Sequence, residues 1–428
     1  MGFNLQILKN IYQSQLFKIS SLNSLSIILK IGIGLITSKL LAVFVGPSGM
    51  ALVGNLRNFM TSLESIATLG FQNGIVKYVA EIKEDKQRFE KLLSTVFISL
   101  AFVAVVLSGV LFVFATFWNQ KIFGTNYQYQ FVFKVLALSL PWYVVSLFLI
   151  AVLNGLGSFK KVIWVNSIGN IIGLVVSVLL IVEYKTFGAL VAFVITPALL
   201  FFVSIYFLNK EISIFKTIKR SSYDFTVLRK LSSYSIMALV SAVLGPFIYL
   251  AIRNNIIQTL GVNQAGFWET MTRISNYYML FVTTILTVYF LPKLAVAKDS
   301  RETKTIFWMF YKGIVPVFIL GVTVIYFARF FIIKLLFTPE FLPVTSLFFW
   351  QLVGDVLKVA SLILGYQFFA KKLTIAFVIT EIASLLLLYF LSMYFVSVFG
   401  VTGVVIAQAI DNFIYLIVLI IYFRRSLF

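Results

Sequence analysis

Twelve apolar runs, each long enough to cross a lipid bilayer, follow one another along almost the whole chain. A helix needs about 20 mainly apolar residues to span a bilayer, and the short alternating segments typical of a membrane β-barrel are missing. With 61% hydrophobic residues and a mean hydropathy of +1.00, we predict an all-α polytopic membrane protein. The predicted spans are 17–45, 50–80, 92–117, 129–154, 161–183, 187–208, 231–253, 264–291, 305–330, 341–369, 373–397 and 400–423.

Lys and Arg gather in alternate connections between these runs, notably 83–91, 209–230 and 293–304, and near both ends, at Lys9 and Arg424. Basic connections stay on the cytoplasmic side of a membrane, so both termini are predicted to be cytoplasmic. The net charge of +20 is therefore a topology signal, and no nucleic-acid partner is predicted. The alternate connections carry few basic residues, and Arg253 is assigned to one of them. We predict a multi-pass protein of a bacterial inner membrane.

The residue types that are missing exclude several kinds of chemistry. The chain contains no Cys and no His, which excludes disulfides, thiolate nucleophiles, histidine-bound metals and histidine proton relays. The outer connections, such as 118–128 and 254–263, are too short for a catalytic domain. We therefore predict neither an enzyme nor a bound metal or cofactor.

The polar stretch 209–230 divides the predicted spans into an N-terminal six-helix bundle, 1–208, and a C-terminal six-helix bundle, 231–428. An even number of spans returns each half to the same side, so a repeat between them would be parallel. Basic residues follow the first turn of each half at matched spacing: Arg57 and Lys77 in one, Arg273 and Lys293 in the other. We predict about twelve transmembrane helices in two bundles around a central cavity.

Charged residues also lie inside the predicted spans, and the basic ones outnumber the acidic ones. Charges in hydrocarbon are costly and usually line a pathway or cavity, where they find partners. The balance favours an anionic cargo over a cationic one. The basic residues are Lys30, Lys39, Arg57, Lys77, Lys134, Arg273, Lys312 and Lys358, and the acidic ones are Glu64, Glu269, Asp355, Glu381 and Asp411.

The second predicted span carries a polar stripe at helical spacing, formed by Arg57, Thr61, Glu64 and Thr68. One interpretation is a substrate path in which the planar fork of Arg57 holds a phosphate group. The other is an interhelical Arg–Glu pair that merely orders helix packing. We favour the cavity interpretation, because ionisable residues within a membrane are usually functional.

Two further basic positions are candidates for the same phosphate. Glu269 and Arg273 are four residues apart in the eighth span, a spacing that also favours a self-neutralised structural pair. Lys30 and Lys39 lie on opposite faces of the first span, and we select Lys30 as the one that faces the cavity. Lys39 is expected to reach the outer interface.

A third set, in the last three spans, consists of Asp355, Lys358, Glu381 and Asp411. Carboxylates in an apolar bundle hold protons more tightly than in water, so one of them could load and release an ion during transport. Equally, Asp355 and Lys358 could neutralise each other as a helix contact. Both interpretations stay open.

Three blocks of the sequence resemble one family. They begin at Lys30-Ile-Gly-Ile-Gly-Leu and continue to Gly46-Pro47-Ser48-Gly49, followed by Gly74-Ile-Val-Lys77 and by Trp350-Gln-Leu-Val-Gly-Asp355-Val-Leu-Lys358. They are similar to the lipid III and O-antigen flippases, the Wzx-type translocases of the multidrug/oligosaccharidyl-lipid/polysaccharide exporter superfamily. The resemblance extends along nearly the whole chain.

This resemblance implies a fold of two six-helix bundles that alternate between inward-open and outward-open states. It implies a cargo of undecaprenyl-diphosphate-linked oligosaccharide, moved from the cytoplasmic to the periplasmic leaflet. In relatives, basic residues on the first, second and eighth helices meet the diphosphate, and Lys30, Arg57 and Arg273 stand at those places here. Implied partners are membrane lipids and polysaccharide polymerase machinery. Alternatives are a multidrug exporter of the same superfamily and a peptidoglycan-precursor flippase.

Overall fold

The computed structural model describes residues 15–427, and most of this backbone is helical. Within this part of the chain, nine helices are long and apolar enough to cross a membrane. The all-α, multi-span fold class is therefore confirmed, and the count of about twelve spans stays a prediction. Lys9, used above to orient the N-terminus, lies outside the described residues.

One predicted span differs from the helices observed. The span 50–80 is two helices, α3 (Gly46–Ala67) and α4 (Gln72–Ile82), because Leu69 and Gly70 adopt positive φ between them. The predicted break between the spans 161–183 and 187–208 is confirmed, because α8 (Phe159–Asn209) consists of two helices that meet at a kink where Lys185 departs from helical angles. Hydropathy reports polarity and not backbone angles, so it did not locate the first break.

Residue contacts divide the chain into two compact units. Unit 1 comprises Met1–Leu40 and Leu63–Leu239, and unit 2 comprises Leu41–Ser62 and Val240–Phe428. The start of α3 thus belongs with the C-terminal helices, whereas the predicted bundle 1–208 assigned it to the N-terminal ones. The physical reason is that Pro47 on α3 packs closely against Gly266 on α11 (Val262–Ile285), within unit 2. The predicted boundary at 209–230 stays a prediction.

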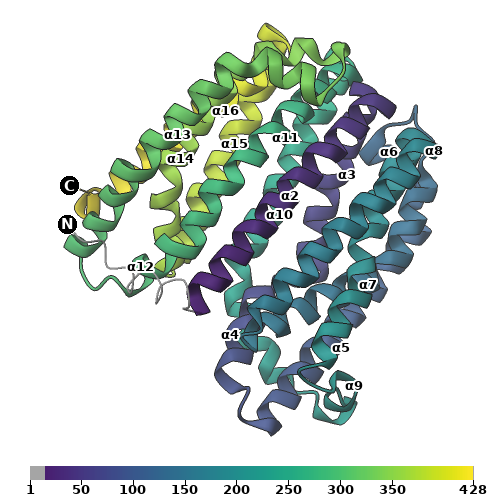
Figure 1. The fold of residues 1–428 in the computed structure, drawn as a ribbon, viewed down its shortest axis with the longest axis vertical. Helices are drawn as coiled ribbons and strands as arrows, with labels where there is room; N and C mark the ends of the chain where they lie inside the picture. Colours follow the sequence, from purple (N-terminus) through teal and green to yellow (C-terminus); the bar gives the residue numbers. More distant parts are fainter. Residues whose placement is uncertain (1–14, 428) are drawn as a thin grey trace, which may run out of the picture. The chain divides into compact units, whose positions relative to one another are not determined.

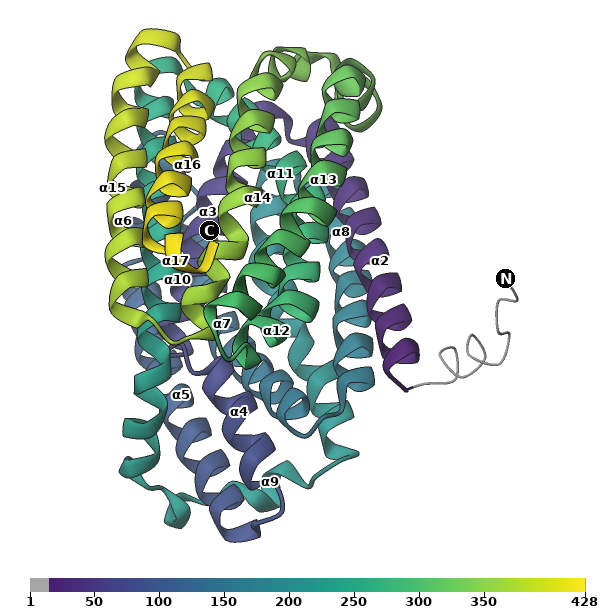
Figure 2. The same cartoon turned by 90° about the vertical axis from the view of Figure 1, so that its left-hand side faces the viewer.

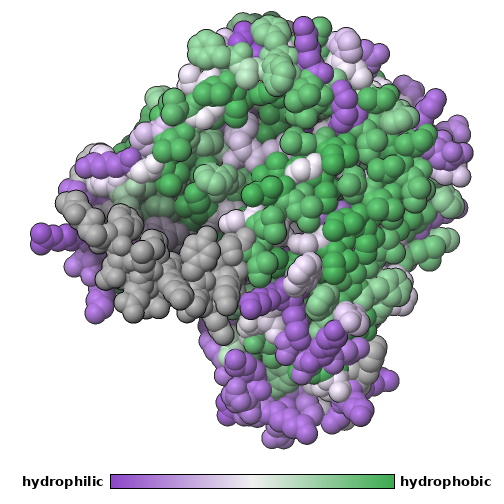
Figure 3. Space-filling model, in the orientation of Figure 1, coloured by the Kyte–Doolittle hydropathy of each residue, from purple (hydrophilic) through white to green (hydrophobic). Residues whose placement is uncertain are grey.

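Unit 1 is organised around α7 (Gln130–Gly155), which packs against α8, α5 (Lys86–Val113) and α4 (Figure 1). Figure 3 shows hydrophobic side chains along α7 and α8, and hydrophilic ones gathered around α9 (Ile214–Thr217). Asp85 caps α5 by accepting a hydrogen bond from the Arg88 amide at 3.1 Å. The other elements of unit 1 are the start of α2 (Gln15–Phe44), α6 (Ala115–Phe123), η1 (Arg220–Ser222) and the start of α10 (Phe225–Leu260).

Unit 2 is organised around α14 (Phe348–Ala370), which packs against α16 (Thr402–Tyr422) and α13 (Ser300–Leu336), while α15 (Thr374–Phe399) packs against α16 (Figure 2). It also contains the first part of α3 and the end of α10. Asp299 caps α13 by accepting a hydrogen bond from the Glu302 amide at 2.8 Å. The other elements of unit 2 are α11, η2 (Leu286–Phe290), α12 (Leu291–Val296), η3 (Pro339–Leu347) and α17 (Arg424–Leu427).

The outer face of α13 has the character of a lipid-facing surface. Val317, Leu320, Val324, Phe327 and Phe331 recur at helical spacing and are all exposed, and Phe327 is 76% exposed. A soluble protein rarely exposes so continuous an apolar surface. Hydrocarbon is therefore the environment that fits this helix.

Candidate functional site

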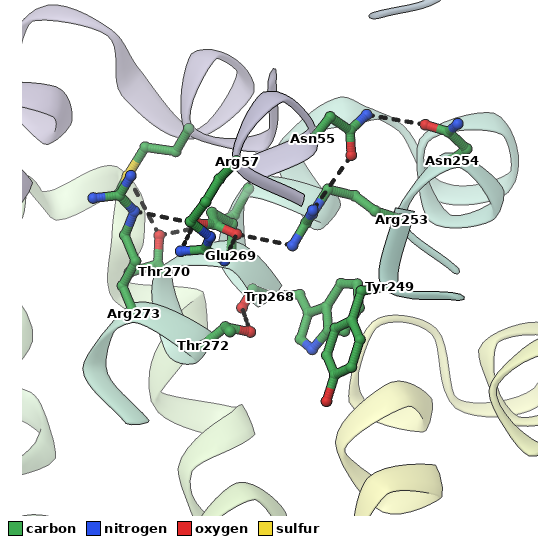
Figure 4. Close-up of polar contacts among 12 residues, drawn as sticks. Asn55, Arg57, Tyr249, Arg253, Asn254, Trp268, Glu269, Thr270, Thr272 and Arg273 are labelled. Atoms are coloured by element: carbon green, nitrogen blue, oxygen red, sulfur yellow. Dashed lines mark hydrogen bonds and ion pairs between the residues drawn. The ribbon is translucent and has the colours of Figure 1, made fainter. Parts of the chain in front are cut away.

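Three arginines meet one glutamate inside unit 2 (Figure 4). Arg57 comes from α3, Arg253 from α10, and Glu269 and Arg273 from consecutive turns of α11. Glu269 lies at the centre, and its side chain is completely buried. We call these four residues the arginine cluster.

Each of the two carboxylate oxygens of Glu269 contacts two guanidinium groups. Its Oε1 lies 2.9 Å from Nη1 of Arg57 and accepts a hydrogen bond from Nε of Arg273 at 3.0 Å. Its Oε2 accepts hydrogen bonds from Nη2 of Arg57 at 3.0 Å and from Nη2 of Arg253 at 2.8 Å. Arg57 therefore grips the carboxylate with both ends of its fork, the strong geometry for an arginine–carboxylate pair. Four donors use the full accepting capacity of this carboxylate.

The arginine cluster carries an excess of two positive charges. Among the described residues, Glu269 is the one carboxylate within 4.0 Å of the guanidinium groups of these three arginines. Arg253 is completely buried, and its Nε has no hydrogen-bond partner in the described part of the chain. Buried charges are stable only when they are paired and hydrogen-bonded, so the cluster is short of anionic acceptors.

Neutral side chains hold Arg253 in place. Its Nη1 donates to Oδ1 of Asn55 at 3.3 Å, and Nδ2 of Asn55 donates to Oδ1 of Asn254 at 2.9 Å. The Arg253 guanidinium lies 5.0 Å from the ring centre of Trp268, which stacks on Tyr249 (Figure 4). A ring face attracts a cation, and the attraction is larger when both are removed from water.

Gly54 on α3 allows this close approach. A Cβ atom at this position would lie 2.4 Å from Oε2 of Glu269 and 3.0 Å from Cζ of Arg253. Since three arginines hold Glu269, its carboxylate cannot simply turn away.

We expect Gly54→Ala to separate α3 from α11 and to destabilise the protein by about 1–3 kcal/mol, the usual cost of overpacking a tight core. Thermal unfolding of the detergent-solubilised protein measures this loss. Gly109→Ala on α5 is the matched control, because a Cβ there meets nothing within 4 Å. Equal melting temperatures for the two variants would contradict the tight packing at Gly54.

Arg57 is the member of the arginine cluster that reaches a polar cavity within unit 2. This cavity of about 320 Å³ is lined by Arg57 and Thr61 from α3, Asp355 and Lys358 from α14, Asp411 from α16, and neighbouring residues. The side chain of Arg57 is 24% exposed, whereas those of Arg253 and Glu269 are completely buried. Of the three arginines, Arg57 is therefore the one that an anion in the cavity would meet.

The carboxylates predicted for ion coupling also lie along cavities of unit 2. Asp355 accepts hydrogen bonds from Ser275 at 2.7 Å, from Gln351 at 3.1 Å and from Tyr278. Asp411 accepts hydrogen bonds from Ser384 at 3.0 Å and 3.1 Å.

A second cavity, of about 340 Å³, joins the remaining members of this set. Lys358 and Asp411 line it as well as the first cavity, and it adds Glu381. The Asp355–Lys358 ion pair considered from the sequence is not formed within 4.0 Å, because polar neighbours bind Asp355 instead.

The other predicted site residues lie in unit 1. Glu64 accepts hydrogen bonds from Tyr143 on α7 and from Gln72 on α4, the latter at 3.2 Å. Arg57 does form an interhelical Arg–Glu pair, the alternative considered from the sequence, and its partner is Glu269 of α11. Lys30 is exposed on α2. Structure thus brings together Arg57, Glu269 and Arg273, but not Glu64.

Arg253 is the residue that the sequence analysis missed. It was assigned to an outer connection, but it lies inside α10, which continues to Leu260. Three successive polar residues, Arg253-Asn254-Asn255, interrupt an otherwise apolar run and were the available signal. A second signal was its position in the chain, since Arg253 precedes the turn at Gly261 much as Lys39 precedes the turn at Gly46.

Comparison with known proteins places the chain in a family. The family model described as polysaccharide biosynthesis protein matches residues 40–346, well over half of the chain. The chain belongs to the polysaccharide biosynthesis protein family. Its relatives include the proteins named Lipid III flippase of Escherichia coli (strain K12) and Shigella flexneri. Each is 30% identical over 412 residues, which cover 95% of this chain and 96% of the relative.

Solved structures show that this family member has the same fold as proteins described as membrane transporters. An inward-facing multidrug resistance MATE family transporter of the MOP superfamily has a TM-score of 0.76 and 15% identity, covering 93% of this chain and 97% of the other. The lipid II flippase MurJ, in an inward closed conformation, has a TM-score of 0.71 and 17% identity, covering 94% and 87%. At such identities the likeness establishes the fold, and the family assignment confirms the resemblance found in the sequence.

Proposed function

We propose that this protein is a flippase for an undecaprenyl-diphosphate-linked oligosaccharide, of the O-antigen or lipid III type. It moves this cargo from the cytoplasmic to the periplasmic leaflet of a bacterial inner membrane by alternating access. The observation that supports this most is the arginine cluster, with an excess of two positive charges and one member, Arg57, in a polar cavity. The relatives named Lipid III flippase support the same class of cargo.

The chemistry of the cargo fits this site. A diphosphate that links a prenyl chain to a sugar carries two negative charges, which match the excess of the arginine cluster. Arginine is suited to phosphate oxygens because its planar fork donates two parallel hydrogen bonds. Amide side chains of Asn58, Asn276 and Asn412 in the same cavity supply donors and acceptors for sugar hydroxyls. The prenyl chain stays in the hydrocarbon of the bilayer.

The remaining assignments complete this proposal. Lys30, on α2, and Arg273 join Arg57 as diphosphate ligands during the cycle. Both termini are cytoplasmic, and the protein changes no covalent bond in its cargo. On the periplasmic side, the lipid-linked glycan becomes available to polysaccharide polymerase machinery.

Transfer between leaflets of a liposome tests the function. We expect the purified protein to move a fluorescent undecaprenyl-diphosphate glycan to the opposite leaflet, and empty liposomes to show no such movement. A peptidoglycan precursor in parallel tests the nearer alternative, and a cationic drug tests the multidrug exporter. Drug transport without glycolipid transfer would contradict the proposal.

We further propose that the second cavity couples transfer to an ion gradient. Asp411, with Asp355, Lys358 and Glu381 near it, takes up and releases the coupling ion. We expect Asp411→Asn to reduce transfer under a proton or sodium gradient to the rate seen without one, because an amide cannot exchange a proton or balance a cation. Leaflet transfer with each gradient imposed separately measures this. Full stimulation of the variant by both gradients would remove Asp411 from the coupling site.

A further inference from the structure

We infer that Glu269 competes with the phosphate groups of the cargo for Arg57. In this arrangement Arg57 is paired with Glu269 while the cavity is empty. The Arg57–Glu269 ion pair breaks when the cargo binds, and it forms again when the cargo leaves. Glu269 is thus a positioning residue that sets both affinity and release. This inference rests on the proposed function.

The geometry makes Arg57 the arginine that can leave. Removing the sole partner of a buried carboxylate is strongly unfavourable, since it leaves an uncompensated charge. Glu269 is different, because Arg253 at 2.8 Å and Arg273 at 3.0 Å remain in contact when Arg57 turns away. The carboxylate therefore stays paired on both oxygens throughout the exchange.

Exposure separates the three arginines in the same way. Arg57 is 24% exposed and lines the cavity, while the side chains of Arg253 and Arg273 are 0% and 11% exposed. Thr61, one turn further along α3, donates its hydroxyl to the carbonyl oxygen of Arg57 at 3.0 Å and lines the same cavity. Arg57 can turn from Glu269 to an anion in the cavity without exposing the rest of the cluster.

Charge explains why such a competitor is useful. Three arginines without Glu269 would bind a dianionic diphosphate tightly and release it slowly. With Glu269 present, the two charges of a bound diphosphate match the excess carried by the arginine cluster, whereas a monophosphate diester, with one charge, leaves one charge of the cluster uncompensated. Glu269, with one negative charge, is therefore displaced from Arg57 more readily by a diphosphate, with two charges, than by a monophosphate diester. When the cargo leaves, Arg57 pairs with Glu269 again.

Two variants that share one substitution test the inference. The probe is a short polyprenyl diphosphate linked to N-acetylglucosamine, and its binding to the solubilised protein is measured directly. Arg253→Met leaves Glu269 with fewer partners, so Glu269 holds Arg57 more firmly, and we expect about tenfold weaker binding. Arg253→Met combined with Glu269→Gln removes the competitor and keeps the excess of two charges, so we expect about tenfold tighter binding and slower release.

Changes of probe affinity in opposite directions for the two variants distinguish competition by Glu269 from a purely structural role. If Glu269 only orders the helices, both variants bind the probe more weakly than the wild type, and the inference is overturned. Glu340→Gln is the charge-matched control, since it removes an exposed carboxylate on η3 outside the arginine cluster, and we expect unchanged affinity. The monophosphate analogue of the probe should bind the wild type more weakly than the diphosphate.

Misfolding of a variant and absence of the proposed function give results that differ from loss of competition. The double substitution removes the completely buried Arg253–Glu269 pair together, and the two arginines that it leaves without a carboxylate, Arg57 and Arg273, are the more exposed members of the cluster. If it does not fold, Glu269→Asp provides the readout: its shorter side chain loosens the hold on Arg57, and weaker probe binding by this variant overturns the inference. Failure of the wild type to transfer any lipid-linked glycan overturns the proposed function and this inference together, whereas transfer with unaltered affinity in the double variant overturns the inference alone.

Discussion

Arg57→Gln is expected to lower the transfer of undecaprenyl-diphosphate glycan about a hundredfold, because hydrogen bonds to charged groups contribute about 1.5–3 kcal/mol each. Arg57 is the arginine of the cluster that lines the cavity, so its fork is the part that meets phosphate oxygens first. The protein should still fold, since Arg253 and Arg273 continue to neutralise Glu269. Leaflet transfer in liposomes, with protein amount and melting temperature matched to the wild type, measures the effect.

Two control variants define the role of Arg57. Arg57→Lys keeps the charge but loses the planar fork, so we expect a rate between those of the wild type and Arg57→Gln. Lys77→Gln removes a half-exposed cation on α4 that pairs with Glu81 at 3.6 Å, and it should leave the rate within about twofold. Undiminished transfer by Arg57→Gln would take Arg57 out of the site while leaving the flippase function in place.

Gly266→Ala is expected to destabilise the protein by about 3 kcal/mol, the upper part of the range for overpacked cores. A Cβ atom on Gly266 would lie 1.9 Å from the carbonyl oxygen of Pro47 and 2.9 Å from its Cα. Both atoms belong to the backbone, so the strain can be relieved only by moving α11 away from the start of α3. Thermal unfolding in detergent measures the loss.

The same movement should also impair transport, because α3 carries Arg57 and α11 carries Glu269 and Arg273. Gly321→Ala on α13 is the control, since a Cβ there meets nothing within 4 Å and alanine favours a helix over glycine. We expect this control to be as stable as the wild type or slightly more so. A Gly266→Ala protein with wild-type stability would show that the α3–α11 contact is looser than described.

The part of the site that local sequence patterns predicted is limited to α3 and α11. Arg57 and Arg273 were selected as charges within spans at matched distances after two turns, and Glu269 as the residue one turn before Arg273. The Glu269–Arg273 contact is confirmed at 3.0 Å, because residues four apart on a helix are neighbours by geometry. Whether these residues bind the cargo's diphosphate stays a prediction.

Contacts between distant segments were not predictable in this way. Arg57 and Glu269 are 212 positions apart, and their pairing depends on which helices cross and at which turn. The sequence indicated an interhelical Arg–Glu pair as the alternative role of Arg57 but did not identify the glutamate. Glu64, the acidic residue of the same predicted span, instead accepts hydrogen bonds from Tyr143 and Gln72 within unit 1.

By itself, the sequence determined that this protein is a polytopic helical membrane protein with a surplus of basic residues inside its spans. Apolar run length and the cost of buried charge are local properties, and they can be read one segment at a time. Only the tertiary structure decided that Arg253 is buried, that three arginines share one carboxylate, and that Arg57 alone among them lines the cavity. These facts depend on the close packing of α3, α10 and α11 within unit 2, where Gly54 and Gly266 leave room for contacts that no single segment specifies.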